Sequence, residues 1–550
     1  MNVAGRIRID NTNSLYTEKL YATSNPTLLE NSKKGKYTET RGEERQTYGD
    51  VMLNISKTFK EKFALDAHIG ASIKDNRFDE LSVYGPIAGA PNIFNVVNLD
   101  KSQKKTPKTG WHEQTQSFFY SLELGWKSQL FVTTTGRNDW ASQLANSPQK
   151  SFFYPSVGVS WLPSSTFNFP EKFNYLKIRA SWASVANPFP RELTIATHPY
   201  DDTISGWDDK SNYPIGQLYP ERTKTWELGF DARFLNGFTL TASWYRADTY
   251  NQTFNPNLSA SSGYSDIYIQ TGHVRNTGVE ASLGYNHQWK NWNWNSQFTF
   301  SWNKNKIIEL CKEWYNPITE ETISMNRLQI SKLGRAKFIL KEGGSMGDLY
   351  STTDLRRDDK GNIEIDEGGN VVVEDNLPDM KLGSVFPDYN LAWRNSVSWK
   401  NLNLGFLVTA RIGGIVNSLT QANMDLFGVS EATAAARDAG GALVNGRSLV
   451  NPETWYTAIA SQGGIPQYYT YSATNVRLQE LSLGYTIPRK WLHNVCSITV
   501  SFVGRNLWMM YCKAPFDPEA VASTNNFYQG MDYFMMPSTR NLGFNINIKF

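Results

Sequence analysis

A strict alternation of apolar and polar residues limits the fold of this sequence more than any other feature. From Asn291 to Asn303 every second side chain is apolar, except Ser296, and the residues between them are amides or hydroxyls. Successive side chains of a strand point to opposite faces of a sheet, whereas a helix cannot separate two such sets. The segment therefore predicts a strand with an aromatic face and a polar face. The aromatic face carries Trp292, Trp294, Phe298, Phe300 and Trp302.

The same alternation recurs along the whole chain and predicts about sixteen strands. Many of them run for about 10–13 residues, which is longer than a typical strand of a globular sheet and suits a tilted strand that crosses a membrane. The predicted strands are 4–10, 50–59, 63–74, 116–126, 128–139, 152–162, 175–184, 225–234, 238–248, 277–289, 292–304, 389–399, 402–412, 475–486, 496–509 and 539–550.

The connections between these strands alternate between short and long. The short ones are Lys60–Lys62, Trp126–Lys127, Leu235–Gly237, Lys290–Asn291 and Lys400–Asn401, with two of medium length at 163–174 and 487–495. The long ones are 11–49, 75–115, 140–151, 185–224, 249–276, 305–388, 413–474 and 510–538. An outer-membrane barrel has short periplasmic turns and long extracellular loops. The pattern predicts an all-β, transmembrane antiparallel barrel whose C-terminus is periplasmic.

Composition excludes several other classes of protein. Lys and Arg number 55 against 52 Asp and Glu, so the net charge of +3 gives no electrostatic case for nucleic acid. Charged residues make up 19% and aromatic residues 13%, which argues against a disordered chain or a coiled coil. No run of about 18 apolar residues predicts a membrane-spanning helix. A mean hydropathy of −0.47 agrees with a barrel, because its apolar signal is spread over alternate residues.

No catalytic constellation is recognisable, so the sequence predicts no enzyme and no catalytic residue. The histidines are scattered, and the sequence contains no HExxH, G-x-S-x-G or Walker motif. Three cysteines form neither a disulfide framework nor a zinc site. The Gly-rich segment Gly343–Gly347 is interpreted as a flexible loop, and the Ala-rich segment Glu431–Ala439 as a short helix.

The long loops are rich in aromatic, amide and acidic residues, which suits a ligand-binding surface. Aromatic rings pack against sugar C–H faces and also dominate protein interfaces, so a glycan and a protein partner fit equally well. The residues predicted to face a substrate are Trp207, Asp208, Tyr213, Tyr468, Tyr469, Tyr471, Phe527, Tyr528 and Tyr533.

Several segments, in order along the chain, resemble the C-terminal part of SusC/RagA-type TonB-dependent outer-membrane transporters. They include YPERTKTWELGFDARFLNGFTLTASWYRADTYNQ (219–252), VRNTGVEASLGYNHQW (274–289), NVRLQELSLGYTIPRKWL (475–492) and the closing MPSTRNLGFNINIKF. The terminal strand, with Phe544, Ile546, Ile548 and Phe550, resembles the barrel-insertion strand of that family. The likeness covers nearly all 550 residues.

The resemblance implies TonB-dependent uptake of a nutrient, an oligosaccharide or a peptide, across the bacterial outer membrane. A SusD-like surface lipoprotein would cover the loops, and the TonB complex would act through an N-terminal plug. Such a barrel has 22 strands. With sixteen strands and no recognisable signal peptide, TonB box or plug, we expect residues 1–550 to form the C-terminal part of the barrel. The family often has an acidic stretch near residues 354–370; this stretch lacks EF-hand spacing, so a solvated loop is preferred over a calcium site and no cofactor is expected.

Two other interpretations remain open at this stage. A self-contained barrel of about sixteen strands would match the size of a passive porin-like channel. A secreted all-β glycan-binding protein would show the same alternation, with its apolar face in a core.

Overall fold

The computed structural model describes the chain except for residues 192, 194–199, 202–205, 208–217, 256–267, 317–319 and 524–527. The chain divides into two compact units, which are taken in turn. The first comprises Met1–Val159, Trp182–Thr223 and Asn257–Gln270, and the second comprises Ser160–Ser181, Lys224–Pro256 and Thr271–Phe550.

The first unit is an antiparallel sheet whose strands follow the order of the chain. Its strands are β1 (Asn2–Leu20), β2 (Lys36–Phe59), β3 (Phe63–Pro86), β4 (Lys108–Trp126), β5 (Leu130–Ala141) and most of β6 (Phe152–Trp161). Two-residue strands β8 (Tyr200–Asp201) and β9 (Gly206–Trp207) pair with each other, and short 3-10 turns occur at Val96–Asn98 and Ser142–Leu144.

β2 and β3 are far longer than a membrane crossing requires. Each has 24 residues, whereas a tilted strand crosses a bilayer in about 9–11. Near the short turn at residues 60–62, the outer face of β3 carries Leu65 and Ile69; farther along, the same face carries Asp75 and Arg77. Much of the segments 11–49 and 75–115, predicted as loops, is therefore strand. It continues beyond the apolar part of the large antiparallel sheet, which we term the wall.

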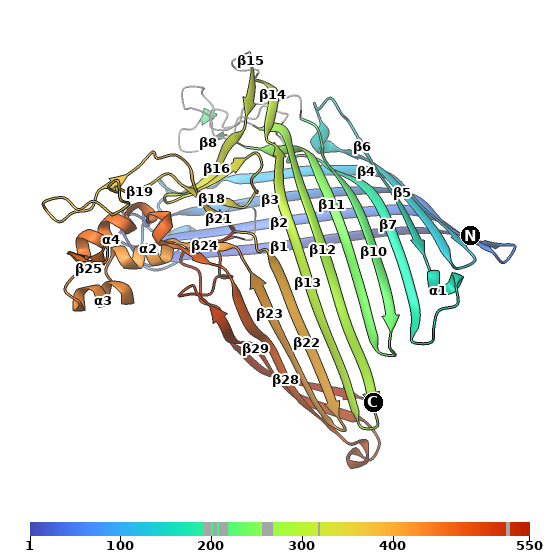
Figure 1. Cartoon of the computed structure of the whole chain (residues 1–550). Helices are drawn as coiled ribbons and strands as arrows, with labels where there is room; N and C mark the ends of the chain where they lie inside the picture. Colours follow the sequence, from blue (N-terminus) through green and yellow to red (C-terminus); the bar gives the residue numbers. More distant parts are fainter. Residues whose placement is uncertain are drawn as a thin grey trace. The chain divides into compact units, whose positions relative to one another are not determined.

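The second unit carries the remaining wall strands, again antiparallel and in chain order (Figure 1). They are the first part of β7 (Phe173–Asn187), then β10 (Glu221–Phe234), β11 (Phe238–Phe254), β12 (Ile269–Trp289), β13 (Trp292–Glu309), β22 (Tyr389–Trp399), β23 (Leu402–Ile412), β28 (Asn475–Ile487), β29 (Ser497–Cys512) and β31 (Asn541–Lys549). Helix α1 (Pro163–Thr166) and a 3-10 turn at Arg489–Leu492 lie in the two connections of medium length. All sixteen predicted strands are found.

The register of these strands separates two faces. One row across five strands is apolar, and the next row is mostly hydroxyl and charged. The apolar row is Leu283, Phe298, Trp393, Val408 and Leu478, and the polar row is Ser282, Thr299, Ala392, Thr409 and Arg477. Ser296, the exception in the alternation, accepts a hydrogen bond from the Trp393 indole at 3.1 Å, so it satisfies a polar group on the apolar face.

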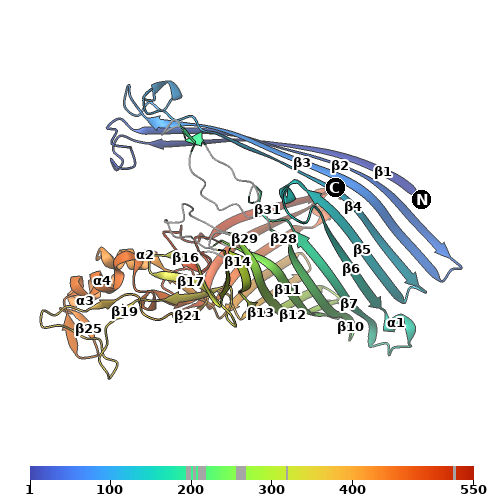
Figure 2. The ribbon, with the colours of Figure 1, turned by 90° about the horizontal axis from the view of Figure 1, so that it is seen from above.

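Most of the buried apolar side chains of the second unit lie outside the wall, in what we term the loop cap (residues 310–388, 413–474 and 513–538). Figures 1 and 2 show its helices grouped at the end of this unit away from the short turns. Phe338, Leu349, Val385 and Met531 are fully buried together in its core. The predicted helix at 431–439 is confirmed as α3.

The loop cap is built from short elements contributed by three connections. The strands are β14 (Cys311–Asn316), β15 (Glu321–Met325), β16 (Arg327–Leu333), β17 (Ala336–Lys341), β18 (Asp348–Ser351), β19 (Asp354–Leu355), β20 (Val373–Glu374), β21 (Met380–Ser384), β24 (Ile415–Ser418), β25 (Ala442–Val444), β26 (Ser448–Val450), β27 (Thr470–Ser472) and β30 (Met531–Asp532). The helices are α2 (Leu419–Leu426), α3 (Glu431–Asp438) and α4 (Pro452–Ala460), with 3-10 turns at Ser461–Gly463 and Pro466–Tyr468. In the part of the chain that the structure describes, no helix has both the length and the apolar character to span a bilayer.

The Gly-rich segment Gly343–Gly347, predicted to be a flexible loop, is anchored to the wall. Ile307 at the end of β13 exchanges backbone hydrogen bonds with Gly343 and Gly344, at 2.8 Å each. The side-chain oxygen of Asn305 accepts a hydrogen bond from the Met346 N–H at 2.8 Å, and Met346 is buried beside Ile307. The segment therefore joins the loop cap to β13.

Candidate functional site

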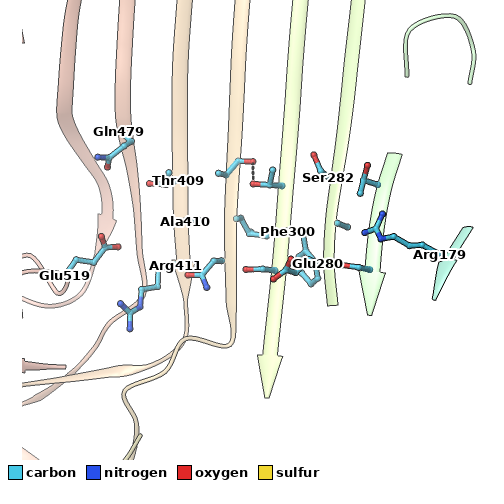
Figure 3. Close-up of a pocket in the computed structure, with 17 residues that line it drawn as sticks. Arg179, Glu280, Ser282, Phe300, Thr409, Ala410, Arg411, Gln479 and Glu519 are labelled. Atoms are coloured by element: carbon cyan, nitrogen blue, oxygen red, sulfur yellow. Dashed lines mark hydrogen bonds between the residues drawn. The ribbon is translucent and has the colours of Figure 1, made fainter. Parts of the chain in front are cut away.

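A cavity of about 650 Å³ lies against the polar face of the wall in the second unit. Most of its labelled lining residues come from strands that run side by side in Figure 3, and Glu519 comes from the loop that follows β29. Glu280 stands nine positions before Trp289, the last residue of β12 before a short turn. At about 3.3 Å per residue and a tilt of about 40–45°, this places the cavity about 20–23 Å above the short turns. The cavity is therefore near the end of the wall that carries the loop cap.

Two rows of the register form the cavity floor. Glu280 pairs with Ser301, which pairs with Asn390, which in turn pairs with Arg411. The adjacent row contributes hydroxyl groups from three strands and one methyl group: Ser282, Thr299, Ala392 and Thr409. Small polar side chains on alternate positions thus give a shallow floor that can both donate and accept hydrogen bonds.

Gln479 reaches the cavity because β28 is irregular at this point. Val408 pairs with Leu478 and Leu407 pairs with Glu480, so Gln479 has no partner residue in the ladder with β23. The ladder with β29 is also irregular between Leu478 and Glu480. Such bulges re-aim a side chain and are frequent beside functional sites. Here the bulge adds an amide to the cavity lining.

Arg179 forms one end of the cavity and is held by two acids of β10. Its guanidinium donates to Asp231 at 2.9 Å and lies 3.6 Å from a carboxylate oxygen of Glu227. Gly229 lies between these acids, and a Cβ there would stand 2.8–2.9 Å from the guanidinium of Arg179. The missing side chain of Gly229 therefore leaves the space that Arg179 occupies.

Glu280 and Arg411 are the charged lining residues that lack an ion pair within the described parts of the chain. The Arg411 guanidinium donates to the Val385 carbonyl at 2.8 Å, but its Nε is buried without a hydrogen-bond partner. The carboxylate of Glu280 has no hydrogen bond or ion pair to a described residue. The cavity therefore presents an acid and a base that form no ion pair among the described residues, although the charge of Glu519 also acts on Arg411.

A buried ion pair fixes the loop beyond β29 next to the cavity. Arg477, 5% exposed, donates to both carboxylate oxygens of Asp517, at 2.8 and 3.2 Å. Burial opposes ionisation of Asp517, but the hydrogen bonds from Arg477 and from the Glu519 N–H outweigh it and hold the pKa of Asp517 below its ordinary value. Glu519, which lines the cavity, accepts a hydrogen bond from Asn475 at 3.1 Å.

The predicted substrate-facing tyrosines of the loops are placed differently from one another. Tyr469 is only 2% exposed and donates to Asp425 at 3.0 Å, so it supports the loop cap rather than facing solvent. Burial, together with the Asp425 charge, raises the pKa of Tyr471 to about 12. Tyr468 packs against the same core. Tyr528 and Tyr533 are exposed.

Other predicted site residues cannot be placed in the cavity. Asp208, Tyr213 and Phe527 lie outside the described residues, as does the side chain of Trp207. None of the predicted loop residues that the structure describes lines the cavity. The lining residues were not predicted from the sequence because they belong to wall strands. There the sequence shows only which alternate positions face the polar side of the sheet.

The terminal strand β31 has the geometry expected of a wall strand. Phe544 pairs with Phe502, Ile546 with Val500 and Ile548 with Ile498, so its apolar side chains continue the apolar face of β29. Lys549 pairs with Ser497, and Phe550 therefore lies at the short-turn end.

The acidic stretch at 354–370 forms two turns that use their own carboxylates. Asp358 accepts hydrogen bonds from the N–H groups of Lys360 and Asn362, and Asp366 accepts one from the Asn370 N–H at 2.7 Å. Hydrogen bonds from Asn362 hold the pKa of Asp358 below its ordinary value. Among the described residues, no three His, Cys, Asp or Glu side chains gather in a metal-binding arrangement.

Comparison with known proteins decides the family. A family model described as TonB dependent receptor-like, beta-barrel, matches residues 6–507. The chain belongs to this family. Its antiparallel sheet is accordingly that of an outer-membrane β-barrel, as the alternation predicted.

Individual relatives agree with this assignment. The chain is 26% identical to the TonB-dependent receptor P3 of Formosa agariphila, over 95% of this chain and 55% of the relative. It is 22% identical to the TonB-dependent receptor SusC of Bacteroides thetaiotaomicron, over 68% of this chain and 38% of the relative. The solved RagAB peptide transporter matches with a TM-score of 0.76 and 18% identity, over 100% of this chain and 60% of that chain.

These matches confirm the resemblance to SusC/RagA-type TonB-dependent transporters. The chain spans about half the length of the curated relatives P3, P26 and P39.

Proposed function

We propose that this chain serves TonB-dependent uptake of an oligosaccharide or a peptide across the bacterial outer membrane. It would supply wall strands, extracellular loops and part of the substrate path. The observation that carries the proposal is the polar cavity on the inner face of the family's wall, lined by hydroxyl, amide and charged groups. We further propose that the chain acts without a cofactor and is not an enzyme.

The orientation follows from the same reasoning. Short turns of outer-membrane barrels are periplasmic, so the loop cap would be extracellular and Phe550 periplasmic. In the longer family members an N-terminal plug would connect the barrel to the TonB complex. Substrate arriving from outside would then meet Tyr528 and Tyr533 in the loop cap before the cavity.

A SusD-like surface lipoprotein is the proposed partner of the loop cap. Apolar side chains around α3 and the β25–β26 hairpin are strongly exposed, among them Phe427 at 75%, Val429 at 70% and Leu443 at 64%. Exposed apolar patches of this kind mark protein interfaces. The SusC and RagAB matches support a lipoprotein as the occupant.

Uptake measurements test the proposal. A strain that carries the intact gene should accumulate labelled oligosaccharides or oligopeptides, and deletion of this gene or of the TonB system should abolish the accumulation equally. Accumulation that persists without TonB would overturn the proposal in favour of a passive channel. A protein that remains in the soluble fraction without detergent would favour a secreted glycan-binding protein.

A further inference from the structure

We propose that the cavity binds a linear ligand at both ends, with Glu280 receiving an ammonium group and Arg411 receiving a carboxylate. The ligand that fits is a short peptide with free termini. This inference rests on the proposed uptake function and names the substrate chemistry of its site.

The separation of the two charged residues is fixed by the strand register. Glu280 on β12 and Arg411 on β23 occupy one row, with Ser301 and Asn390 between them. Neighbouring strands lie about 4.8 Å apart, so three spacings separate the two backbone positions by about 14 Å. An extended peptide rises about 3.4 Å per residue, and about four residues therefore span this distance.

The other charges of the cavity are already engaged. Arg179 is held by Asp231 and Glu227. Glu519 accepts from Asn475 and lies 3.5 Å from the Arg477 guanidinium. Arg411 is half-buried and its Nε lacks a hydrogen-bond partner, so it gains most from a ligand of opposite charge, while the exposed carboxylate of Glu280 is accessible to a cation. Figure 3 shows both residues on the same stretch of wall.

The floor between the two ends suits a peptide backbone. Ser301 and Asn390 lie in the same row, the hydroxyls of Ser282 and Thr409 lie in the next, and Gln479 adds an amide. These groups donate to carbonyl oxygens and accept from N–H groups without reading side chains. A neutral oligosaccharide offers hydroxyl groups to the floor but no charge to either end.

The test is calorimetric titration of the purified full-length protein with tetraalanine, N-acetyl-tetraalanine and tetraalanine amide. For the unaltered protein, acetylation and amidation should each weaken binding about 10-fold or more, because each removes one charge-assisted contact. In Glu280→Gln, acetylation should no longer matter while amidation still does. In Arg411→Gln, amidation should no longer matter while acetylation still does.

Matched controls come from the same wall face. Arg394→Gln and Glu480→Gln each remove one charge outside the cavity lining. Both residues lie in one row of the register, two rows nearer the short turns than the row of Glu280 and Arg411. Both should keep the unaltered preference for free termini. The inference would be overturned by equal binding of free and capped peptides or by the absence of peptide binding. It would also be overturned if E280Q and R411Q lost the same affinity for free and for capped peptides.

The same variants separate this inference from the proposed function. Suppose that TonB-dependent import of capped peptides or of neutral oligosaccharides is unchanged in E280Q and R411Q. This result would refute recognition of both peptide ends but would leave the proposed uptake function in place. Absence of any TonB-dependent uptake would refute the function itself.

Discussion

An arginine placed on the apolar face of β13 should destabilise the protein far more than one placed on the adjacent polar position. Phe298 stands six positions from Trp292, the first residue of β13 after a short turn. At about 3.3 Å per residue and a tilt of about 40–45°, it lies about 14–15 Å above that turn, near the middle of an apolar band about 25 Å tall. Leu283 and Trp393 flank it in the register.

The expected cost of Phe298→Arg is about 2–4 kcal/mol, the range for arginine at the bilayer midplane on a lipid-facing position. The matched control is Gln297→Arg, which places the same side chain on the polar face one residue away. Gln297 already donates to Ser282 at 3.0 Å and pairs with Arg394, so the control should cost about 1 kcal/mol from the lost hydrogen bond and the added like charge.

The assay is equilibrium unfolding in urea with the protein inserted in lipid vesicles, followed by tryptophan fluorescence. Heat-modifiable migration on gels gives an independent measure of the folded fraction. If the two variants lose the same stability within about 0.5 kcal/mol, the assignment of the lipid-facing side is wrong. If Gln297→Arg is the more damaging variant, the two faces are reversed.

Three further predictions concern the loop cap. Tyr469→Phe leaves the buried Asp425 with one partner fewer, and we expect about 1–3 kcal/mol less local stability, seen as faster proteolysis of the cap with an unchanged wall. Hydrogen bonds from Arg327, and secondly from Lys341, hold the pKa of Asp379 well below its ordinary value despite burial. The ionised carboxylate therefore stabilises the loop cap at neutral pH, and this stabilisation is lost as pH falls through about 4 and below. Asp379→Asn should weaken the pH dependence of the rate at which the cap is proteolysed. Phe427→Asp should reduce co-purification of a surface lipoprotein without changing the melting temperature; unchanged co-purification would place the interface elsewhere.

The sequence predicts the wall strands well at one end and poorly at the other. The start of β3 at Phe63 agrees with its prediction, but the strand ends at Pro86 rather than at residue 74. Lipid imposes the alternation only where it touches the strand. Beyond that boundary Asp75 and Arg77 face outward into water, both faces mix polar and apolar side chains, and the pattern that identifies a strand disappears.

The candidate site was harder to predict for a different reason. Aromatic content pointed to loop residues such as Tyr469, but tertiary packing placed that ring in the core of the loop cap. Glu280 and Arg411 are far apart in the sequence and become neighbours of one cavity only through the register of four strands. Alternation gives the face on which a residue lies and says nothing about its row.

The separate core of the loop cap has a consequence for how these molecules respond to their surroundings. Phe338, Leu349, Val385 and Met531 are sealed by their own chain, so water, rather than acyl chains, drives their burial. A thinner bilayer or a change of detergent would strain the strands below, whereas the packing above them would keep the free energy of an ordinary aqueous globule. Two solvents thus shape one polypeptide, and a change in one part reaches the other through the places where they pack together, as at Met346 beside Ile307.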